Sequence, residues 1–388
     1  MFLKNNMTRV FYRKYRPMAF SEFVGQEHIV KTLTNGLSSG LISHAYLFSG
    51  PKGSGKTSLA RLLAKAVNCQ GRKESQAEPC NKCSSCLEIM GGRSLDLIEI
   101  DAASHRGIDE VRELRDGIRF VPVKSKYKVF IFDEAHQLTK EAANALLKTL
   151  EEPPTYAIFI LATTEIHKMI PTIISRCQRF NFSRLTLAEI LKKLETICQK
   201  EKVKIVFRQA QDNPEQGRRI EKSALELIAL NSQGSLRDAE SLLDQVFTLY
   251  GSEKEIKVED LKDLLGLVEI GLISQFTDFL AQKKSAQAIN FLNELGQKGM
   301  DLSEFAKTLI NYLRQALLLK IMGEDGKAIV CGLTREEFQK LKEQSEIFKE
   351  EEIKKIINLF LDAQTKMKYS SIPQLPLELA TIESCEQT

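Results

Sequence analysis

The sequence predicts an α/β domain with a five-stranded parallel sheet, followed by regions built mainly from helices. Three observations favour this fold class. A glycine-rich motif at residues 50–57 lies between a strand-like run and a helical pattern. Apolar runs alternate with helical patterns as far as residue 182, as they do in parallel sheets that are covered by helices. Beyond that residue, apolar side chains recur mainly at helical spacing.

Length and composition indicate a globular protein of two or three domains. The chain has 388 residues, of which 43% are hydrophobic and 27% are charged. No apolar run approaches the ~20 residues of a membrane span, and the first residues lack the apolar core of a signal peptide. We therefore expect a cytoplasmic protein without a membrane partner. Because the net charge is only +4, contact with nucleic acid would need a local basic surface.

The motif at residues 50–57, called the phosphate loop below, predicts a nucleoside triphosphate site. It fits G-x-x-x-x-G-K-[ST] and consists of Gly50, Pro51, Lys52, Gly53, Ser54, Gly55, Lys56 and Thr57. The glycines let backbone N–H groups face the phosphates, and the following helix adds partial positive charge at its N-terminus. We expect Lys56 to reach the β- and γ-phosphates and Thr57 to bind Mg²⁺. The nucleotide is either ATP or GTP.

The remaining strands of the sheet are expected in four further runs. They are residues 96–100, 128–132, 157–162 and 179–182, and the first strand is residues 44–48. The second and third of these runs are apolar throughout, which is typical of strands buried on both faces. Helices are predicted at 108–120 and at 139–152, where two prolines end the second helix.

Polar residues at the ends of two of these strands are candidates for catalysis. Asp133 is placed to hold Mg²⁺ through water, and Glu134 to orient and polarise the attacking water. Thr164 could contact the γ-phosphate, although threonine is common at strand ends. From the residues alone, Arg176 and Arg237 are ordinary surface arginines by default.

Four cysteines in a polar insertion predict a metal site. Cys69, Cys80, Cys83 and Cys86 follow the pattern C-x₁₀-C-x₂-C-x₂-C. Thiolates at this spacing suit tetrahedral Zn²⁺, and the insertion has too few apolar residues to fold without a metal. We expect a closed structural zinc site, with an iron–sulfur cluster as the alternative. The other cysteines are expected to be ordinary thiols.

After residue 182 the sequence predicts a small helical domain. Thr186 and Ser235 each occupy an N-cap position, and Thr186 forms a capping-box pattern with Glu189. Residues 209–222 are polar and predict an exposed loop, and the only strand-like run in this region is 203–207. A hinge is expected at 251–254, with helices beyond it, the clearest at 301–322.

Together, these motifs resemble those of the bacterial DNA polymerase III tau/gamma family, which provides the ATPase of the replicative clamp loader. The resemblance covers roughly residues 12–265 and weakens beyond them. Its general motifs are Tyr-Arg-Lys-Tyr-Arg-Pro (12–17), Val-Gly-Gln-Glu-His (24–28), His-Ala-Tyr-Leu-Phe-Ser-Gly (44–50) and Glu-Ile-Asp-Ala-Ala-Ser (99–104). More specific are Asn-Ala-Leu-Leu-Lys-Thr-Leu-Glu-Glu-Pro-Pro (144–154), Leu-Ala-Thr-Thr (161–164), Ser-Arg-Cys (175–177), Gly-Ser-Leu-Arg-Asp-Ala (234–239) and the four-cysteine insertion.

The resemblance assigns roles that spacing could not. It implies an AAA+ P-loop NTPase in which Arg176 reaches the ATP site of the neighbouring subunit as an arginine finger. Arg237 would be the sensor-2 residue that reads the γ-phosphate in its own subunit, and Thr164 would be sensor 1. The arm at residues 12–17, including Tyr15 and Pro17, and the nearby Val24 would flank the adenine, which favours ATP.

The resemblance also implies domains and partners. Residues 1–182 would form the ATPase core, with the zinc insertion at about 69–86, residues 183–250 the lid, and residues 251–388 the collar that holds the subunits together. The partners would be the delta and delta-prime subunits, further copies of this chain, the sliding clamp and primer-template DNA. DNA would be held by its backbone phosphates near Arg106. ATP binding and hydrolysis would open the clamp and load it onto primed DNA.

The sequence departs from the family pattern in two places, and two alternative functions stay open. Residues 209–222 are longer than the family's usual connection, and the chain ends at Thr388 without a tau-type extension, so we expect a gamma-length product or a shortened chain. One alternative is a hexameric motor of the branch-migration type. The other is a stator subunit that hydrolyses nothing, which Lys56 and Glu134 argue against. The expected activity is ATP hydrolysis within DNA polymerase III, since the chain has no polymerase site.

Overall fold

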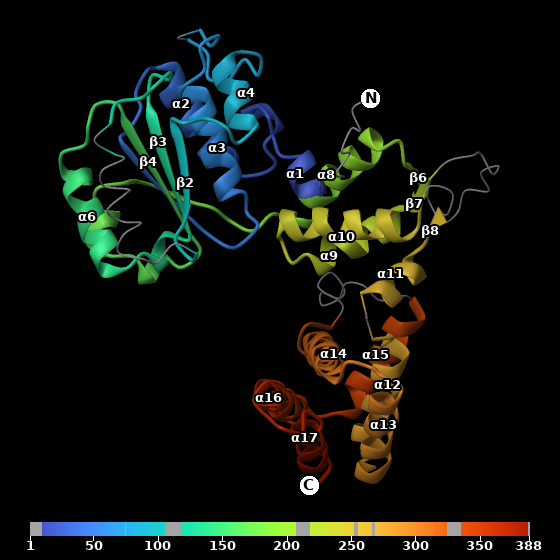
Figure 1. The fold of residues 1–388 in the computed structure, drawn as a ribbon. Coiled ribbons are helices and arrows are strands. Elements are labelled where there is room, and N and C mark those ends of the chain that lie inside the picture. Colours follow the sequence, from blue (N-terminus) through green and yellow to red (C-terminus); the bar gives the residue numbers. More distant parts are fainter. Residues whose placement is uncertain are drawn as a thin grey trace. The chain divides into compact units, whose positions relative to one another are not determined.

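The computed structural model describes residues 10–73, 75–104, 118, 120–206, 218–251, 255–265, 268–323 and 335–386. The chain forms two compact units, Met1–Val258 and Glu259–Thr388, which Figure 1 colours from blue to yellow and from orange to red. Most of the helix expected at 108–120, the expected DNA-contact residue Arg106 and most of the expected hinge lie outside the described residues. Among the described helices, none is both long and apolar enough for a membrane crossing.

A parallel five-stranded sheet forms the centre of the first unit, which confirms the predicted fold class. Its strands are β1 (Ala45–Ser49), β2 (Leu97–Asp101), β3 (Lys128–Asp133), β4 (Ala157–Thr163) and β5 (Gln178–Asn181). They lie in the order β2-β3-β4-β1-β5, and all pairs are parallel. The phosphate loop follows β1 and Asp133 ends β3, so both meet at the carboxyl edge where such sheets bind ligands.

Helices cover both faces of this sheet because its strands are apolar on both sides (Figure 1). On one face, α2 (Glu27–Ser38) and α3 (Lys56–Val67) share a core with Tyr46 and Phe48 of β1. On the other face, α6 (Lys140–Glu151) and α7 (Pro171–Ile174) share a core with Leu47 of the same strand. The alternation of side chains along β1 thus assigns neighbouring residues to opposite layers.

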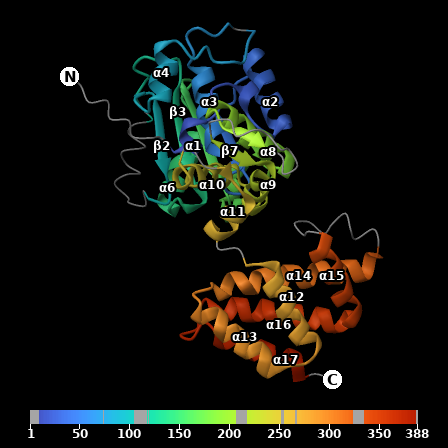
Figure 2. The same cartoon turned by 90° about the vertical axis from the view of Figure 1, so that its right-hand side faces the viewer.

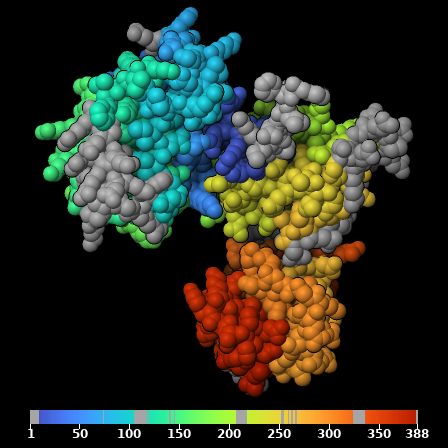
Figure 3. Space-filling view, in the orientation of Figure 1, coloured from blue at the N-terminus to red at the C-terminus, as the bar shows by residue number. Residues whose placement is uncertain are grey.

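The four-cysteine insertion begins after α3 and ends within α4 (Ser84–Met90), which packs against α3. The Cys83 thiol caps α4 by accepting a hydrogen bond from the Cys86 amide. In the space-filling view, the light-blue insertion lies beside the dark-blue N-terminal residues (Figure 3). Those residues include α1 (Phe11–Lys14) and the short 3-10 helix η1 (Phe20–Glu22).

In the described part of the first unit, the helices that follow the sheet are α8 (Leu187–Lys200), α9 (Lys222–Asn231) and α10 (Leu236–Leu249). Both predicted caps are confirmed, because Thr186 and Glu189 form a reciprocal capping box and Ser235 accepts a hydrogen bond from the Asp238 amide. Phe11 of α1 packs edge-to-face on Phe247 of α10, which ties the N-terminus to this helical region.

One prediction for this region is wrong. Residues 219–221 lie within the expected exposed loop, but they form β7 (Arg219–Glu221), the central strand between β6 (Lys204–Val206) and β8 (Glu255–Ile256). Ile220 in β7 is fully buried. The strands are too short to show an alternating pattern, and their pairing partners are distant in sequence, so spacing could not reveal them. Residues 209–217 of that expected loop lie outside the described residues.

In its described part, the second unit consists of helices around one core (Figure 2). They are α12 (Ile270–Ala281), α13 (Ser285–Gln297), α14 (Leu302–Met322), α15 (Arg335–Ile347), α16 (Glu350–Met367) and α17 (Leu375–Glu386), with α11 (Val258–Leu264) preceding them. The rings of Phe305 and Phe360 both pack edge-to-face on Phe276. Asp301 caps α14, and the apolar stripe predicted for this helix faces the core of its own unit.

Candidate nucleotide-binding site

The phosphate loop adopts a backbone that only glycine accommodates easily. Gly53 and Gly55 have φ angles of 76° and 98°, in the left-handed region. A Cβ atom on Gly53 would lie 2.0 Å from the Ser235 hydroxyl, and one on Gly55 would lie 2.6 Å from the ring of Phe23. The loop is therefore packed between the start of α10 and the N-terminal residues. The Leu236 amide also donates a hydrogen bond to the Gly53 carbonyl at 3.2 Å.

The loop surrounds the ammonium group of Lys56. Its Nζ donates hydrogen bonds to the carbonyl oxygens of Gly50 and Pro51, each at 2.8 Å. Burial lowers the pKa of Lys56, while the nearby carboxylates Glu134 and Asp133 oppose that change. The ammonium is thus held inside the loop, where phosphate oxygens could replace the carbonyls as acceptors.

Thr57 and Asp133 form a pair of oxygen ligands that fits Mg²⁺. The Thr57 hydroxyl donates a hydrogen bond to the Asp133 carboxylate at 2.9 Å, although the two residues come from α3 and the end of β3. Hydroxyl and carboxylate oxygens beside a phosphate loop are the donors that Mg²⁺ prefers, and they leave room for water and phosphate ligands. The two residues that the sequence assigned to the metal are therefore brought together.

Glu134 is fixed by Thr164 at the end of the neighbouring strand. The Thr164 hydroxyl donates to the Glu134 carboxylate at 2.8 Å. Glu134 has a φ of 48°, a left-handed conformation that turns the chain sharply after β3. His136, which the sequence did not single out, is buried beside this pair and lies 3.0 Å from the Thr163 hydroxyl. Its position could have been found only from the pairing of β3 with β4.

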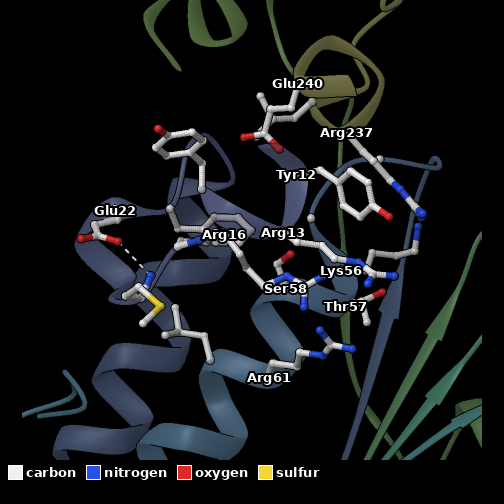
Figure 4. Close-up of a pocket in the computed structure, with 18 of the residues that line it drawn as sticks. Tyr12, Arg13, Arg16, Glu22, Lys56, Thr57, Ser58, Arg61, Arg237 and Glu240 are labelled. Atoms are coloured by element: carbon white, nitrogen blue, oxygen red, sulfur yellow. Dashed lines mark hydrogen bonds between the residues drawn. The ribbon is translucent and has the colours of Figure 1, made fainter. Parts of the chain in front are cut away.

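A cavity of about 1060 Å³ connects these groups with the N-terminal arm. Its lining includes Lys52 to Thr57, Asp133 and Glu134, which the motifs assigned to this site, and Tyr15, Pro17, Val24 and Arg237, which the family resemblance assigned to it. Gly50, Pro51, Thr164 and Arg176 are not among the described residues that line it. Figure 4 shows Arg13 and Arg16 of the arm among the residues that line the cavity with Lys56 and Thr57. The cavity lining contains more basic than acidic side chains, and Asp133 and Glu134 lie beside the phosphate loop.

Arg237 enters the cavity from the first turn of α10. Its guanidinium lies 4.7 Å from the centre of the Tyr12 ring, which fixes it by a cation–π contact (Figure 4). One turn further along α10, Glu240 is only 5% exposed and also lines the cavity. Burial raises the pKa of Glu240 to about 7, against the opposing charge of Lys193. The sequence did not identify Tyr12, Glu240 or Lys193 individually, although helical spacing places Glu240 on the same face as Arg237.

Arg176 has a different environment. It follows α7, and its guanidinium donates hydrogen bonds to the Glu151 carboxylate at 2.6 Å and to the Thr172 carbonyl at 2.8 Å. Its side chain is 32% exposed. Of the two arginines that the sequence singled out, the structure therefore brings Arg237 to the phosphate loop and keeps Arg176 on the surface.

The four predicted cysteine ligands converge in the insertion. The sulfur atoms of Cys69, Cys80, Cys83 and Cys86 all lie within 4.8 Å of one another. The Cys80 amide donates to the Cys69 sulfur at 3.2 Å, and the Cys83 amide to the Cys80 sulfur at 3.3 Å. Backbone hydrogen bonds from Lys82 and Cys83 lower the pKa of Cys80 to about 6, which favours the thiolate that a metal binds. These residues fit a single tetrahedral metal ion.

Three known families match successive parts of the chain. The family described as "DNA polymerase III, delta subunit" matches residues 25–186. The "DNA polymerase III clamp loader subunit, ATPase lid domain" matches residues 214–251. The "DNA polymerase III subunits gamma and tau domain III" match residues 256–387.

Curated relatives extend over nearly the whole chain. The DNA polymerase III subunit tau of Bacillus subtilis is 42% identical over 375 residues, which are 97% of this chain and 63% of that protein. The Escherichia coli subunit tau is 37% identical over 83% of this chain and 48% of its own length. The subunit gamma of Buchnera aphidicola is 33% identical over 96% of this chain and 98% of its own length. The chain thus spans only about half to two thirds of the length of these tau relatives.

Among solved structures, the Bacillus subtilis DNA clamp loader delta protein is similar over 92% of this chain and 99% of its own chain, at 16% sequence identity and a TM-score of 0.37.

Proposed function

Because the chain belongs to the family of DNA polymerase III gamma and tau subunits, we propose that it is the ATPase subunit of a replicative clamp loader. It uses ATP binding and hydrolysis to open the sliding clamp and to load it onto primed DNA. The observation that carries this proposal is that Lys56, Thr57, Asp133 and Glu134 all line a single large cavity. This set is what phosphoryl transfer to water needs.

In this proposal each group has a separate task. Lys56 neutralises the β- and γ-phosphates, and Thr57 with Asp133 holds Mg²⁺, which supplies charge stabilisation to the phosphates. Glu134 accepts a proton from the attacking water, and its bond to Thr164 holds the carboxylate in place until nucleotide arrives. Arg237 contacts the γ-phosphate from within the same chain, while Tyr15, Pro17 and Val24 surround the adenine.

Arg176 acts on the neighbouring subunit. Its bonds to Glu151 and Thr172 keep it outside its own cavity, and its exposure leaves it available to a second chain. An arginine supplied in trans can raise turnover by ~10³–10⁵. Hydrolysis then removes the γ-phosphate that joins the subunits, so the assembly loosens and releases a closed clamp.

The remaining assignments follow from the same family. The domains are the ATPase core (1–182), the lid (183–250) and the collar (251–388). The partners are the delta and delta-prime subunits, further copies of this chain, the clamp, and DNA held by its phosphates. The cysteine site takes structural Zn²⁺. A single ion is favoured over an iron–sulfur cluster because thiolates on different iron atoms lie farther apart than those on one ion.

The test is a mixing experiment with the other loader subunits. Arg176→Ala chains keep their own site but cannot complete the next one, whereas Glu134→Gln chains have the opposite defect. A loader assembled from both chains should hydrolyse ATP faster than the average of the two parent assemblies, since some sites receive both groups. Strictly average turnover in the mixture, or DNA unwinding by this chain alone, would contradict the proposal.

A further inference from the structure

We propose that the four-cysteine insertion positions the N-terminal wall of the nucleotide cavity, so that metal binding strengthens nucleotide binding. The link runs through Glu78 and Asn81, two side chains between the first and third cysteines. The inference rests on the proposed ATP site and adds a positioning role for residues that line no part of the cavity.

The insertion depends on its metal site for order. In its described part, no helix or strand forms between α3 and α4. Within it, the four sulfur atoms converge and Arg72 donates hydrogen bonds to the carbonyls of Leu37, Ala66 and Gln76. A segment with so few apolar side chains obtains most of its folding free energy from the metal. The position of Glu78, two residues before Cys80, is therefore coupled to metal binding.

Glu78 joins the insertion to the N-terminal segment. Its carboxylate accepts hydrogen bonds from the amides of Phe20 and Ser21, at 2.7 and 2.8 Å. These amides belong to the start of η1, where no preceding turn supplies an acceptor. Charge-assisted bonds of this kind are stronger than neutral ones.

A second link passes through Lys65 of α3. This lysine is only 3% exposed, and its Nζ donates hydrogen bonds to the Asn81 side-chain oxygen and to the Met18 carbonyl, both at 2.7 Å. The ammonium therefore joins α3, the insertion and the N-terminal segment at one point. Asn81 has a φ of 58°, so its placement requires the turn that the cysteines form.

The segment held in this way is part of the cavity wall. Pro17 and Met18, which precede the amides of Phe20 and Ser21 in the chain, line the cavity. Glu22 and Phe23, which follow these amides, line it as well. Phe20 anchors the segment in the core, and the Phe23 ring contacts the phosphate loop at Gly55. Loss of the bonds to residues 18–21 would therefore loosen the cavity wall without removing any group that contacts nucleotide.

The experiment distinguishes the effect of losing the metal from the effect of losing the hydrogen bonds that Glu78 accepts. In the full chain, Glu78→Ala keeps all four thiols, and Cys80→Ser removes one. Glu88→Ala is the matched control, because Glu88 lies in α4, just after the last cysteine, and pairs with Lys124. Three quantities are measured: metal per chain by elemental analysis, affinity for a non-hydrolysable ATP analogue by calorimetry, and amide exchange at residues 18–24.

We expect Glu78→Ala to retain its metal, to bind the analogue about threefold to tenfold more weakly, and to exchange the Phe20 and Ser21 amides faster. Cys80→Ser should weaken binding at least as much, and Glu88→Ala should match the unmodified chain. Unchanged affinity in Glu78→Ala, or in metal-depleted unmodified chain, overturns the inference. If Glu78→Ala does not fold, Asn81→Gly decides, because glycine tolerates the same backbone. Failure of the unmodified chain to bind the analogue would instead refute the proposed function.

Discussion

Arg176, which follows α7, and Arg237, in the first turn of α10, differ in the surroundings that the chain provides. Arg237 reaches into the cavity and is held by the face of Tyr12. Arg176 lies outside the described cavity lining and is held on the surface by Glu151 and Thr172. Both carry the same charge, yet only Arg237 lines the described cavity of its own chain. In the proposed function, this difference divides the site into a part that one chain completes and a part that a second chain supplies.

The largest effect is expected from Arg176→Ala. In the assembled loader, turnover should fall by ~10³ or more, since a trans arginine is a main source of transition-state charge stabilisation. The affinity of the isolated chain for ATP should not change, because Arg176 lies outside its own cavity. Arg179→Ala is the matched control, as Arg179 is exposed and bonds only to Asn181 among the described partners. Weaker ATP binding by isolated Arg176→Ala would remove the distinction between the two arginines.

Arg237→Ala should differ from Arg176→Ala by weakening ATP binding in the isolated chain. Here the isolated chain should lose about tenfold to a hundredfold in ATP affinity, which is the range for one charge-assisted bond or two. ADP affinity should change much less, because the γ-phosphate is the group that Arg237 contacts in the proposed function. Calorimetry with both nucleotides measures this. Equal losses for ATP and ADP would show that Arg237 supports the cavity rather than reading the γ-phosphate.

The buried surroundings of Arg237 also predict a pH-dependent stability. Burial raises the pKa of Glu240 to about 7, so the folded state binds this proton more tightly than the unfolded state. The group stabilises the fold at low pH, and this contribution is lost as pH rises from the unfolded value near 4.5 through 7. Glu240→Gln should therefore raise the free energy of unfolding at pH 8 relative to the unmodified chain, by about 3 kcal/mol. Denaturant titrations of both chains at pH 5 and pH 8 measure the change, and a gain independent of pH would contradict it.

The smallest effect is expected from Glu151→Gln. The pair with Arg176 is solvent-exposed, and such pairs contribute about 0–1 kcal/mol. Loss of the pair should leave the stability of the chain unchanged and should alter turnover in the assembled loader by no more than about threefold. A loss as large as that of Arg176→Ala would mean that Glu151 itself takes part in the neighbouring site.

Features that depend on neighbouring residues could be predicted from the sequence. The phosphate loop, the apolar strands, the caps at Thr186 and Ser235 and the cysteine spacing are local, because glycine conformation, helix capping and metal ligation require particular residues at short separations. The parallel sheet also brings Thr57 and Asp133 together, as the Mg²⁺ roles expected for both residues require.

Only the tertiary structure decided which distant residues meet. It buried Glu240, placed Glu78 against the amides of Phe20 and Ser21, and paired β7 with strands far away in the sequence. It also separated Arg237 from Arg176, which look alike as single arginines in the sequence. These features arise from packing between elements, where burial and charge depend on the whole fold, so no local pattern encodes them.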